Sequence, residues 1–161
     1  MTNEYSFYLL GGTITKKYDQ STGSMLNTFD DRDDFIKMFV HFNIEIPDIN
    51  VICAQDSNYL THNNLDDLEH YLYSSQSLYH IVVMGTDKMV NTAKYIGDIG
   101  KSIIFVGSFI PMQINNSDAL FNLGFAMGAA KYIDKKTYIA MNGKVFHHMN
   151  VIKNFTEQKF E

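Results

Sequence analysis

Small, hydroxylic and acidic residues follow four apolar stretches of the sequence, each of which has the composition of a buried strand. They are Gly12 and Thr13; Asp56, Ser57 and Asn58; Gly85, Thr86 and Asp87; and Gly107 and Ser108. In an open parallel sheet, ligands bind outside the carboxyl ends of the strands, so we expect the four groups to converge on one edge. Because a threonine hydroxyl is a weak nucleophile until a neighbouring base or charge network activates it, a hydroxyl beside a carboxylate there favours nucleophilic catalysis.

The first group lies in "LLGGTIT", residues 9–15, and three interpretations of it are open. A phosphate-binding loop is the weakest, because neither G-x-G-x-x-G nor G-x-x-x-x-G-K-[ST] is present and no helix signature follows directly. The two glycines could form only a tight turn or a close backbone approach. The third interpretation is that they end a strand so that the hydroxyl of Thr13 projects from the edge of the sheet.

The stretch "MGTDKM" has a structural and a chemical interpretation. In the structural one, Thr86 is the N-cap of the following helix and Asp87 is a favourable carboxylate in its first turn. In the chemical one, Thr86 and Asp87 stand at the same edge as Thr13 and supply the charge network that a hydroxyl nucleophile requires.

Strand-like and helix-like stretches alternate along the chain. Strands are expected at 5–10, 50–55, 78–84, 101–107 and 136–141, and helices at 32–42, 61–75, 87–99 and 117–133. Continuous apolar strands separated by helices predict a mostly parallel sheet with helices on both faces, a three-layer Rossmann-like or flavodoxin-like α/β fold. Asn142-Gly143 predicts a C-terminal hairpin over 142–148. The polar segment 15–31 is long for a connection and is expected to be a functional lid or a disordered loop.

Composition limits the classes of protein to consider. The 161 residues carry a formal net charge of -5 with no basic cluster, which argues against nucleic acid as the main partner. We see no linker or domain boundary and expect residues 1–161 to form a single domain. No stretch is apolar enough to span a membrane or resembles a signal peptide, and the lone Cys53 cannot form an internal disulfide, so a cytoplasmic protein is expected. Cys53 is expected to be a core residue, with a catalytic thiol as the alternative.

The histidines do not suggest a metal site. His147 and His148 are adjacent, so on a strand they would point to opposite faces and could not share one ion. The remaining histidines lie in different expected elements without ligand spacing, at His41, His62, His70 and His80. We therefore expect neither a metal nor another cofactor.

Five motifs in order resemble those of the bacterial-type L-asparaginases and their relatives. They are "GGTI", "DSN", "GTDKM.NTA", "VGSFIPM...NSDALFNL" and "IAMNGKVF...NVIKN". The resemblance runs from about Tyr5 to about Phe155 and implies a hydrolase that releases ammonia from L-asparagine or a similar small amide. The length resembles that of short members of the family, which correspond to the larger N-terminal domain of the usual two-domain enzyme.

The resemblance also implies roles for individual residues. Thr13 would attack the side-chain amide and form an acyl-enzyme. Thr86, Asp87 and Lys153 would form the threonine–lysine–aspartate set that moves protons. Ser57 and Asn58 would lie beside the substrate α-carboxylate, preceded by Asp56 in the "DS" form that is common in the family. Asp87 would also face the α-ammonium, and the backbone around Gly12, Gly85 and Ser108 would line the pocket. Tyr18 is the one tyrosine of the 15–31 segment that could serve as the catalytic loop tyrosine.

The sequence departs from the family pattern in three places. Met84 and Lys88 replace residues of the usual "HGTDT", and Ser24 follows Gly23 where a tyrosine is common. In two-domain members the partner subunit's small domain closes the pocket. These departures keep open an inactive or weakly active relative that binds an amino acid or a protein. A generic flavodoxin-like module that binds a nucleotide is a separate alternative.

The stretch "LFNLGFAMGAAKYI" predicts a helix that is apolar almost all round. Such a helix is either deeply buried or half-buried against a partner. Together with the oligomeric nature of the family that the sequence resembles, this predicts a homodimer or a larger homo-oligomer.

Overall fold

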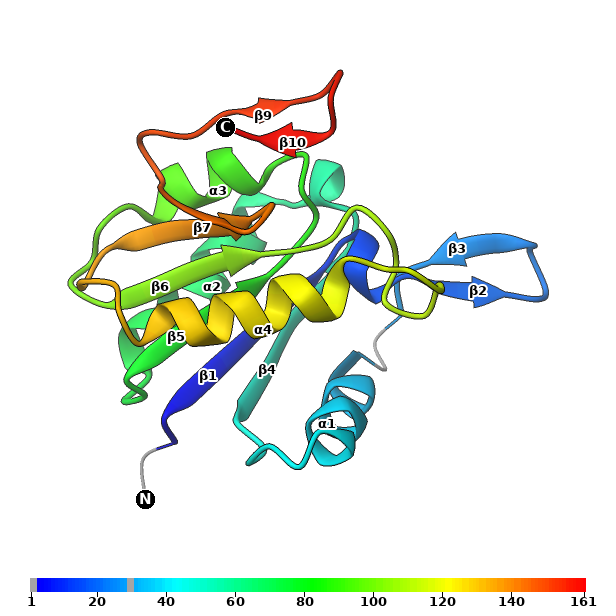
Figure 1. Cartoon of the computed structure of the whole chain (residues 1–161), viewed down its shortest axis with the longest axis horizontal. Helices are drawn as coiled ribbons and strands as arrows, with labels where there is room; N and C mark the ends of the chain where they lie inside the picture. The colour runs from blue at the N-terminus through cyan, green and yellow to red at the C-terminus, as the bar shows by residue number, and fades with distance from the viewer. Residues whose placement is uncertain (1–2, 29–30) are drawn as a thin grey trace.

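A six-stranded sheet forms the centre of the computed structural model, which describes residues 3–28 and 31–161 (Figure 1). Its strands, in spatial order, are β4 (Asp48–Gln55), β1 (Tyr5–Gly11), β5 (Tyr79–Val83), β6 (Ser102–Val106), β7 (Thr137–Met141) and β8 (Lys144–His147). The first five are parallel, and β8 pairs with β7 in the antiparallel sense. Every residue of β1 and of β6 is buried, as expected for parallel strands covered on both faces.

Helices cover both faces of the sheet. In Figure 1, α1 (Asp31–His41) and α4 (Ala119–Ala130) lie on the near face, and α2 (His62–Ser74) and α3 (Met89–Ile96) lie behind it. The rings of Phe35 and Phe39 pack against Phe7 of β1, with centroids 6.1 and 5.2 Å away. The predicted three-layer α/β fold is therefore confirmed.

Two helix starts show how local sequence sets the boundaries. The side chain of Thr61 accepts a hydrogen bond from the backbone of Asn64, and the Asn64 side chain accepts one in return, so a capping box begins α2. The N-cap of α3 is Lys88, which makes no side-chain cap. The interpretation of Thr86 as an N-cap is therefore wrong, and its hydroxyl is left for another partner.

Hairpins account for most of the remaining chain. Asn142 and Gly143, with φ values of 54° and 69°, form the predicted tight turn between β7 and β8. The described part of segment 15–31 contains a hairpin of β2 (Lys17–Asp19) and β3 (Ser24–Leu26). The expectation of a disordered loop is therefore wrong for this part, and residues 29 and 30 lie outside the described residues. A further hairpin of β9 (Lys153–Asn154) and β10 (Lys159–Phe160) was not predicted.

No helix in the described parts of the chain is both long and apolar enough to cross a bilayer.

Candidate active site

Two glycines bring the carboxyl ends of β1 and β5 into direct contact. Gly12 has φ +85°, and a Cβ atom there would lie 2.1 Å from the backbone nitrogen of Gly85. No residue with a side chain fits at position 12, because the clash would be with backbone. The close backbone approach considered for "LLGGTIT" is confirmed. It also brings Thr13 and Thr86 near each other, since each directly follows one of these glycines.

Lys153 is the centre of a polar cluster at this edge. Its Nζ donates to Oγ1 of Thr86 at 2.8 Å and to Oδ1 of Asp87 at 2.5 Å. The Lys153 side chain is only 4% exposed. The rings of Phe109 and Phe155 lie 5.4 and 4.8 Å from Nζ, so aromatic faces rather than water surround the rest of the ammonium.

The carboxylate of Asp87 joins this cluster to the end of β4. The hydrogen bond from Lys153 is the main cause that holds the pKa of Asp87 below its ordinary value, and the amide of Asn58, 3.0 Å from Oδ2, acts in the same direction. Asp87 is therefore ionised at neutral pH, and its side chain stays 42% exposed to a ligand.

The residues after β4 form the neighbouring part of the edge. Asn58 donates to Asp56 through both its backbone and its amide, and Lys16 donates to the other oxygen of Asp56 at 3.1 Å. Burial raises the pKa of Asp56, but the backbone N–H of Asn58 and the ammonium of Lys16 outweigh it, and the pKa is lowered. Lys16 thus links the segment after Thr13 to the segment after β4.

Ser57 lies inside this edge rather than on its surface. It is buried, its hydroxyl accepts the backbone N–H of Lys88 at 3.3 Å, and its Cβ lies 2.9 Å from where a Cβ on Gly85 would be. Ser57 therefore fixes the loop that carries Thr86 and Asp87.

Thr13 begins a short 3-10 helix (Thr13–Thr15) whose backbone is held by its neighbours. The amide of Asn27 donates to the carbonyl of Gly12 at 2.6 Å and to the hydroxyl of Thr15 at 3.1 Å. The hydroxyl of Thr13 itself makes no hydrogen bond to any residue that the structure describes. A fixed backbone with an uncommitted hydroxyl suits a nucleophile that awaits a substrate.

Two of the predicted site residues stand apart from this cluster. Ser108 is buried, and its hydroxyl donates to the carbonyl of Ile110 at 2.6 Å, so its side chain is committed to the loop after β6. Tyr18 lies on the projecting β2–β3 hairpin and is 62% exposed (Figure 1). A role for either residue stays a prediction.

Two residues that hold the edge were not singled out from the sequence. The carboxylate of Asp118 accepts the backbone N–H groups of Phe109 and Ile110, and Asn122 donates to the carbonyl of Gly107 and to Asp118. They fix the loop whose Phe109 ring faces the ammonium of Lys153. "NSDALFNL" signalled them as part of a motif, but their partners in the loop after β6 lie 8 to 15 residues away along the chain.

Cys53 does not belong to the site. It is buried, its thiol lies 3.4 Å from the carbonyl of Leu10, and burial raises its pKa to about 11. A protonated thiol is a poor nucleophile, so the expectation of a core residue is confirmed.

The expectation that His147 and His148 point to opposite faces is wrong. Strand β8 ends at His147, so the alternation of side chains does not extend to His148. Both rings turn toward Asp98, and their centroids are 4.5 Å apart.

The fold and the cluster together define a class: a doubly wound α/β protein with a hydroxyl–lysine–carboxylate set at the carboxyl edge of a parallel sheet. The family model described as "Asparaginase, N-terminal" matches residues 6–160. The chain therefore belongs to the asparaginase family. No curated protein sequence matches it significantly.

Solved structures of L-asparaginases have the same fold. A probable cytoplasmic L-asparaginase from Campylobacter jejuni superposes with a TM-score of 0.78 at 20% identity, over 99% of this chain and 53% of the other. L-asparaginase I from Vibrio cholerae gives 0.77 at 21% identity, over 99% and 51%. The thermostable enzyme from Thermococcus kodakarensis gives 0.76 at 19% identity, over 98% and 50%. The chain spans about half the length of each of these structures.

Proposed function

We propose that this chain is an amidohydrolase domain that converts the side-chain amide of L-asparagine, or of a similar small amide, to the acid and ammonia. One observation carries the proposal: the ammonium of Lys153 donates to both Thr86 and Asp87 at the edge where the Thr13 hydroxyl is uncommitted. Membership of the asparaginase family and the likeness to solved L-asparaginases support it.

Thr13 is the proposed nucleophile. Its oxygen attacks the amide carbon, the carbonyl becomes an oxyanion, and collapse of this intermediate expels ammonia and leaves an ester on Thr13. Water then attacks the ester and restores the hydroxyl. Backbone N–H groups around Gly12, Gly85 and Ser108 are the proposed donors to the oxyanion.

Thr86 is the proposed proton carrier. Because the Thr86 oxygen accepts a hydrogen bond from Lys153, its own proton is directed away from the lysine. Thr86 can give that proton to the departing nitrogen and take one from Thr13, while the buried ammonium stabilises negative charge on its oxygen. Asp87 holds the ammonium in place.

Asp87 has a second proposed role in binding. Its carboxylate is ionised and partly exposed, so it can pair with the α-ammonium of an amino-acid substrate. Asp56, Ser57 and Asn58 line the adjacent stretch of the edge, where the substrate α-carboxylate would lie close to the ammonium of Lys16.

The proposal is tested by measuring ammonia release from L-asparagine, L-glutamine and D-asparagine. We expect turnover of at least one amide, reduced to background in Thr13→Ala and partly retained in Thr13→Ser, which keeps a hydroxyl. A folded protein that releases no ammonia from any of the three would overturn it.

One observation favours a second function, that of a binding domain with little turnover. The side chain of Asp87, which makes an ion pair with Lys153, stays 42% exposed. An open site binds a ligand without excluding water from it. Calorimetric binding of L-aspartate without any amide turnover would favour this function.

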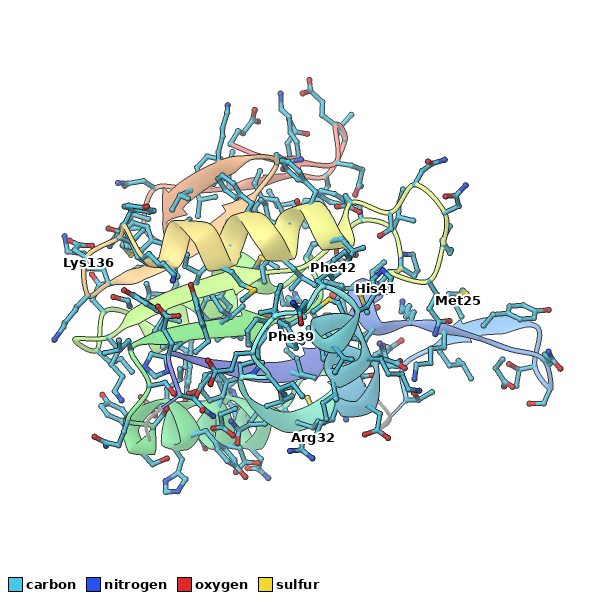
Figure 2. The ribbon with its side chains drawn as sticks, turned by 60° about the horizontal axis from the view of Figure 1, so that its bottom comes forward. Met25, Arg32, Phe39, His41, Phe42 and Lys136 are labelled. Atoms are coloured by element: carbon cyan, nitrogen blue, oxygen red, sulfur yellow. The ribbon has the colours of Figure 1, made fainter. Side chains whose placement is uncertain are left out.

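We further propose that the protein forms homo-oligomers through the face made by α1 and α4. Phe42, Leu120 and Phe121 are 49%, 44% and 63% exposed. With Met38 and Met127 they line an open apolar groove of about 510 Å³. Figure 2 shows Phe39 and Phe42 at the end of α1 that lies beside α4. An apolar surface of this kind favours burial against a partner, and sedimentation velocity tests it.

Two broader inferences accompany the proposal. We infer that residues 1–161 form one domain, because the family model spans residues 6–160. A cytoplasmic location stays a prediction from the sequence.

A further inference from the structure

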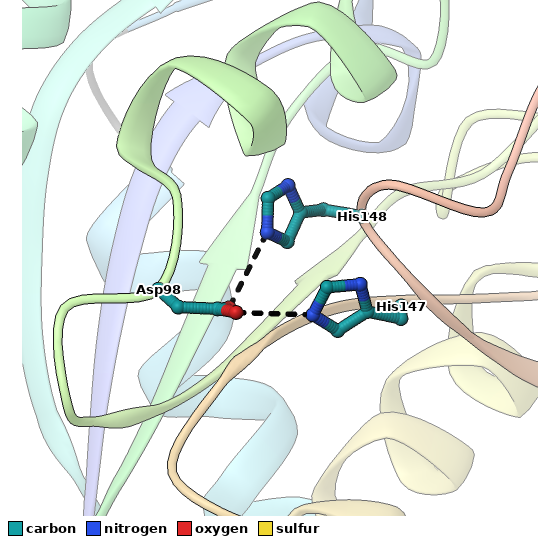
Figure 3. Close-up of side chains that lie close together, drawn as sticks. All are labelled: Asp98, His147 and His148. Carbon is teal, nitrogen blue, oxygen red and sulfur yellow. Dashed lines mark hydrogen bonds and ion pairs between the residues drawn. The ribbon is translucent and has the colours of Figure 1, made fainter.

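A second polar cluster lies at the opposite edge of the sheet, where β7 begins and β8 ends. It consists of Asp98, in the loop after α3, and the consecutive His147 and His148 (Figure 3). One ligand-type atom from each of the three residues lies within 4.8 Å of the others. Figure 3 shows both imidazole rings directed at the same carboxylate. None of these residues takes part in the proposed amide hydrolysis.

The separations within this cluster suit a metal ion. Nε2 of His147 lies 3.1 Å from Oδ2 of Asp98, and Nε2 of His148 lies 3.3 Å from Oδ1. Zinc bonds of about 2.0–2.1 Å in a tetrahedron place neighbouring ligands about 3.3 Å apart. Each ring nitrogen therefore lies about one edge of such a tetrahedron away from a different oxygen of the Asp98 carboxylate.

Neighbouring groups hold the three side chains in place. Asp98 Oδ1 accepts the backbone N–H of Thr137 at 2.9 Å, and the ring of Tyr138 packs edge-on against that of His147, with centroids 5.5 Å apart. Such outer contacts orient metal ligands. The His148 side chain is 6% exposed, whereas those of His147 and Asp98 are 24% and 36% exposed. The cluster is thus closed on one side and open to an entering ion on the other.

The ring of His148 is directed at the cluster through Nε2 (Figure 3). Its Nδ1 is buried and has no hydrogen-bond partner among residues 3–28 and 31–161. Every polar contact of this buried ring is therefore with Asp98. Nε2 is therefore the nitrogen that this ring offers to an ion.

We propose that Asp98, His147 and His148 form a binding site for one divalent zinc-class ion, with two imidazole nitrogens, the Asp98 carboxylate and a water as ligands. Imidazole and carboxylate suit Zn²⁺, and a site with three protein ligands keeps the fourth position for water. The ion would bridge the loop after α3 to the chain that leaves β8. It thereby anchors the segment that reaches Lys153 five residues after His148.

The test begins with protein that has been treated with a chelator and then freed of it by gel filtration. This protein is titrated with ZnCl2 by calorimetry, and the absorption spectrum after addition of CoCl2 is a second readout. We expect one Zn²⁺ per chain and a Co²⁺ spectrum of tetrahedral type. Asp98→Asn keeps an oxygen for the N–H of Thr137, and His147→Gln changes a partly exposed residue, so both should fold. Each should weaken zinc binding by at least about 100-fold, the upper end of what loss of an outer contact alone costs.

The matched control is His62→Gln, which removes an exposed histidine from the start of α2. It should bind zinc as the wild type does. Circular dichroism establishes that each variant is folded, and zinc should raise the thermal midpoint of the wild type but not of Asp98→Asn. Absence of zinc binding by the wild type, or binding unchanged in both cluster variants, would overturn the proposal. Neither result bears on ammonia release, so this test is independent of the proposed hydrolase activity.

Discussion

The two edges of the central sheet hold their polar groups in different ways. At the carboxyl edge, carboxylates pair with lysines, and Asp87 and Asp56 have lowered pKa values and are charged at neutral pH. At the amino edge, histidines predominate, and burial lowers the pKa of His80 to about 4 and also lowers that of His148. The difference lies in the partners of the carboxylates: lysines face Asp87 and Asp56 at the carboxyl edge, whereas imidazoles face Asp98, whose pKa is also lowered, at the amino edge.

The C-terminal chain connects the two edges. Strand β8 returns to the amino edge at His147, and the next residues run back to Lys153 at the carboxyl edge. Residues 148–150 form a turn, in which the N–H of Asn150 donates to the carbonyl of His147 at 2.9 Å, before the chain reaches Lys153. The segment is therefore fastened by Asp98 at one end and by Asp87 at the other.

The largest expected effect is at the carboxyl edge. Lys153→Met removes the donor to Thr86 and leaves Asp87 without its main partner, so amide turnover should fall on the order of 10³-fold or more. Lys159→Met is the control, because Lys159 lies on the same hairpin and pairs only with Glu157 and Glu161 in the described structure. Equal activity of the two variants in a coupled ammonia assay would show that Lys153 takes no part in catalysis.

A backbone change tests how the carboxyl edge is built. Gly12→Ala places a Cβ 2.1 Å from the nitrogen of Gly85, and we expect a loss of roughly 3 kcal/mol or more in the free energy of unfolding. Gly23→Ala is matched, because Gly23 also has positive φ but nothing lies within 4 Å of its added Cβ. It should cost about 1 kcal/mol, the penalty of the backbone conformation alone. Urea denaturation measures both, and similar losses would refute the close contact.

The amino edge should control the response to acid. Burial lowers the pKa of His80 from 6.5 to about 4, so the unfolded chain binds the proton first as pH falls. The contribution of neutral, buried His80 to the free energy of unfolding is therefore fully present above pH 6.5. It is lost progressively as the pH falls to about 4, and the total loss is about 3 kcal/mol. Urea denaturation from pH 7 to pH 4 should show a smaller loss in His80→Gln than in the wild type. A pH dependence that His80→Gln leaves unchanged would count against this assignment.

The smallest of these effects concerns the loop after β6. Asp118→Ala removes the acceptor of the backbone N–H groups of Phe109 and Ile110, and should cost about 2 kcal/mol of unfolding free energy. Asp67→Ala, on the exposed side of α2, should change it by less than about 0.5 kcal/mol. If Asp118→Ala loses amide turnover under conditions in which it is still fully folded, this loop also positions Lys153 through Phe109.

The residues of the carboxyl edge could be predicted from the sequence because they depend only on the strands being parallel. Asp56, Asn58 and Asp87 follow parallel strands, and such strands end at one edge whatever their side chains do. Lys153 could be found only through the resemblance to a family, since 67 residues separate it from Thr86 and no local pattern links them.

The predictions that proved wrong relied on extending a local rule by one or two residues. Thr86 is not the N-cap of α3, because its hydroxyl accepts from Lys153 and the helix begins three residues later. His148 does not alternate with His147, because the strand has already ended. Tertiary contacts decided both positions.

The most direct test of the central claim is ammonia release from L-asparagine by the wild type and by Thr13→Ala, measured side by side on folded protein. The account predicts turnover by the wild type and background release by the variant, because the carboxyl edge supplies proton transfer but only Thr13 supplies the nucleophile. Turnover of the same size in both proteins would contradict it and would assign the chemistry to another residue.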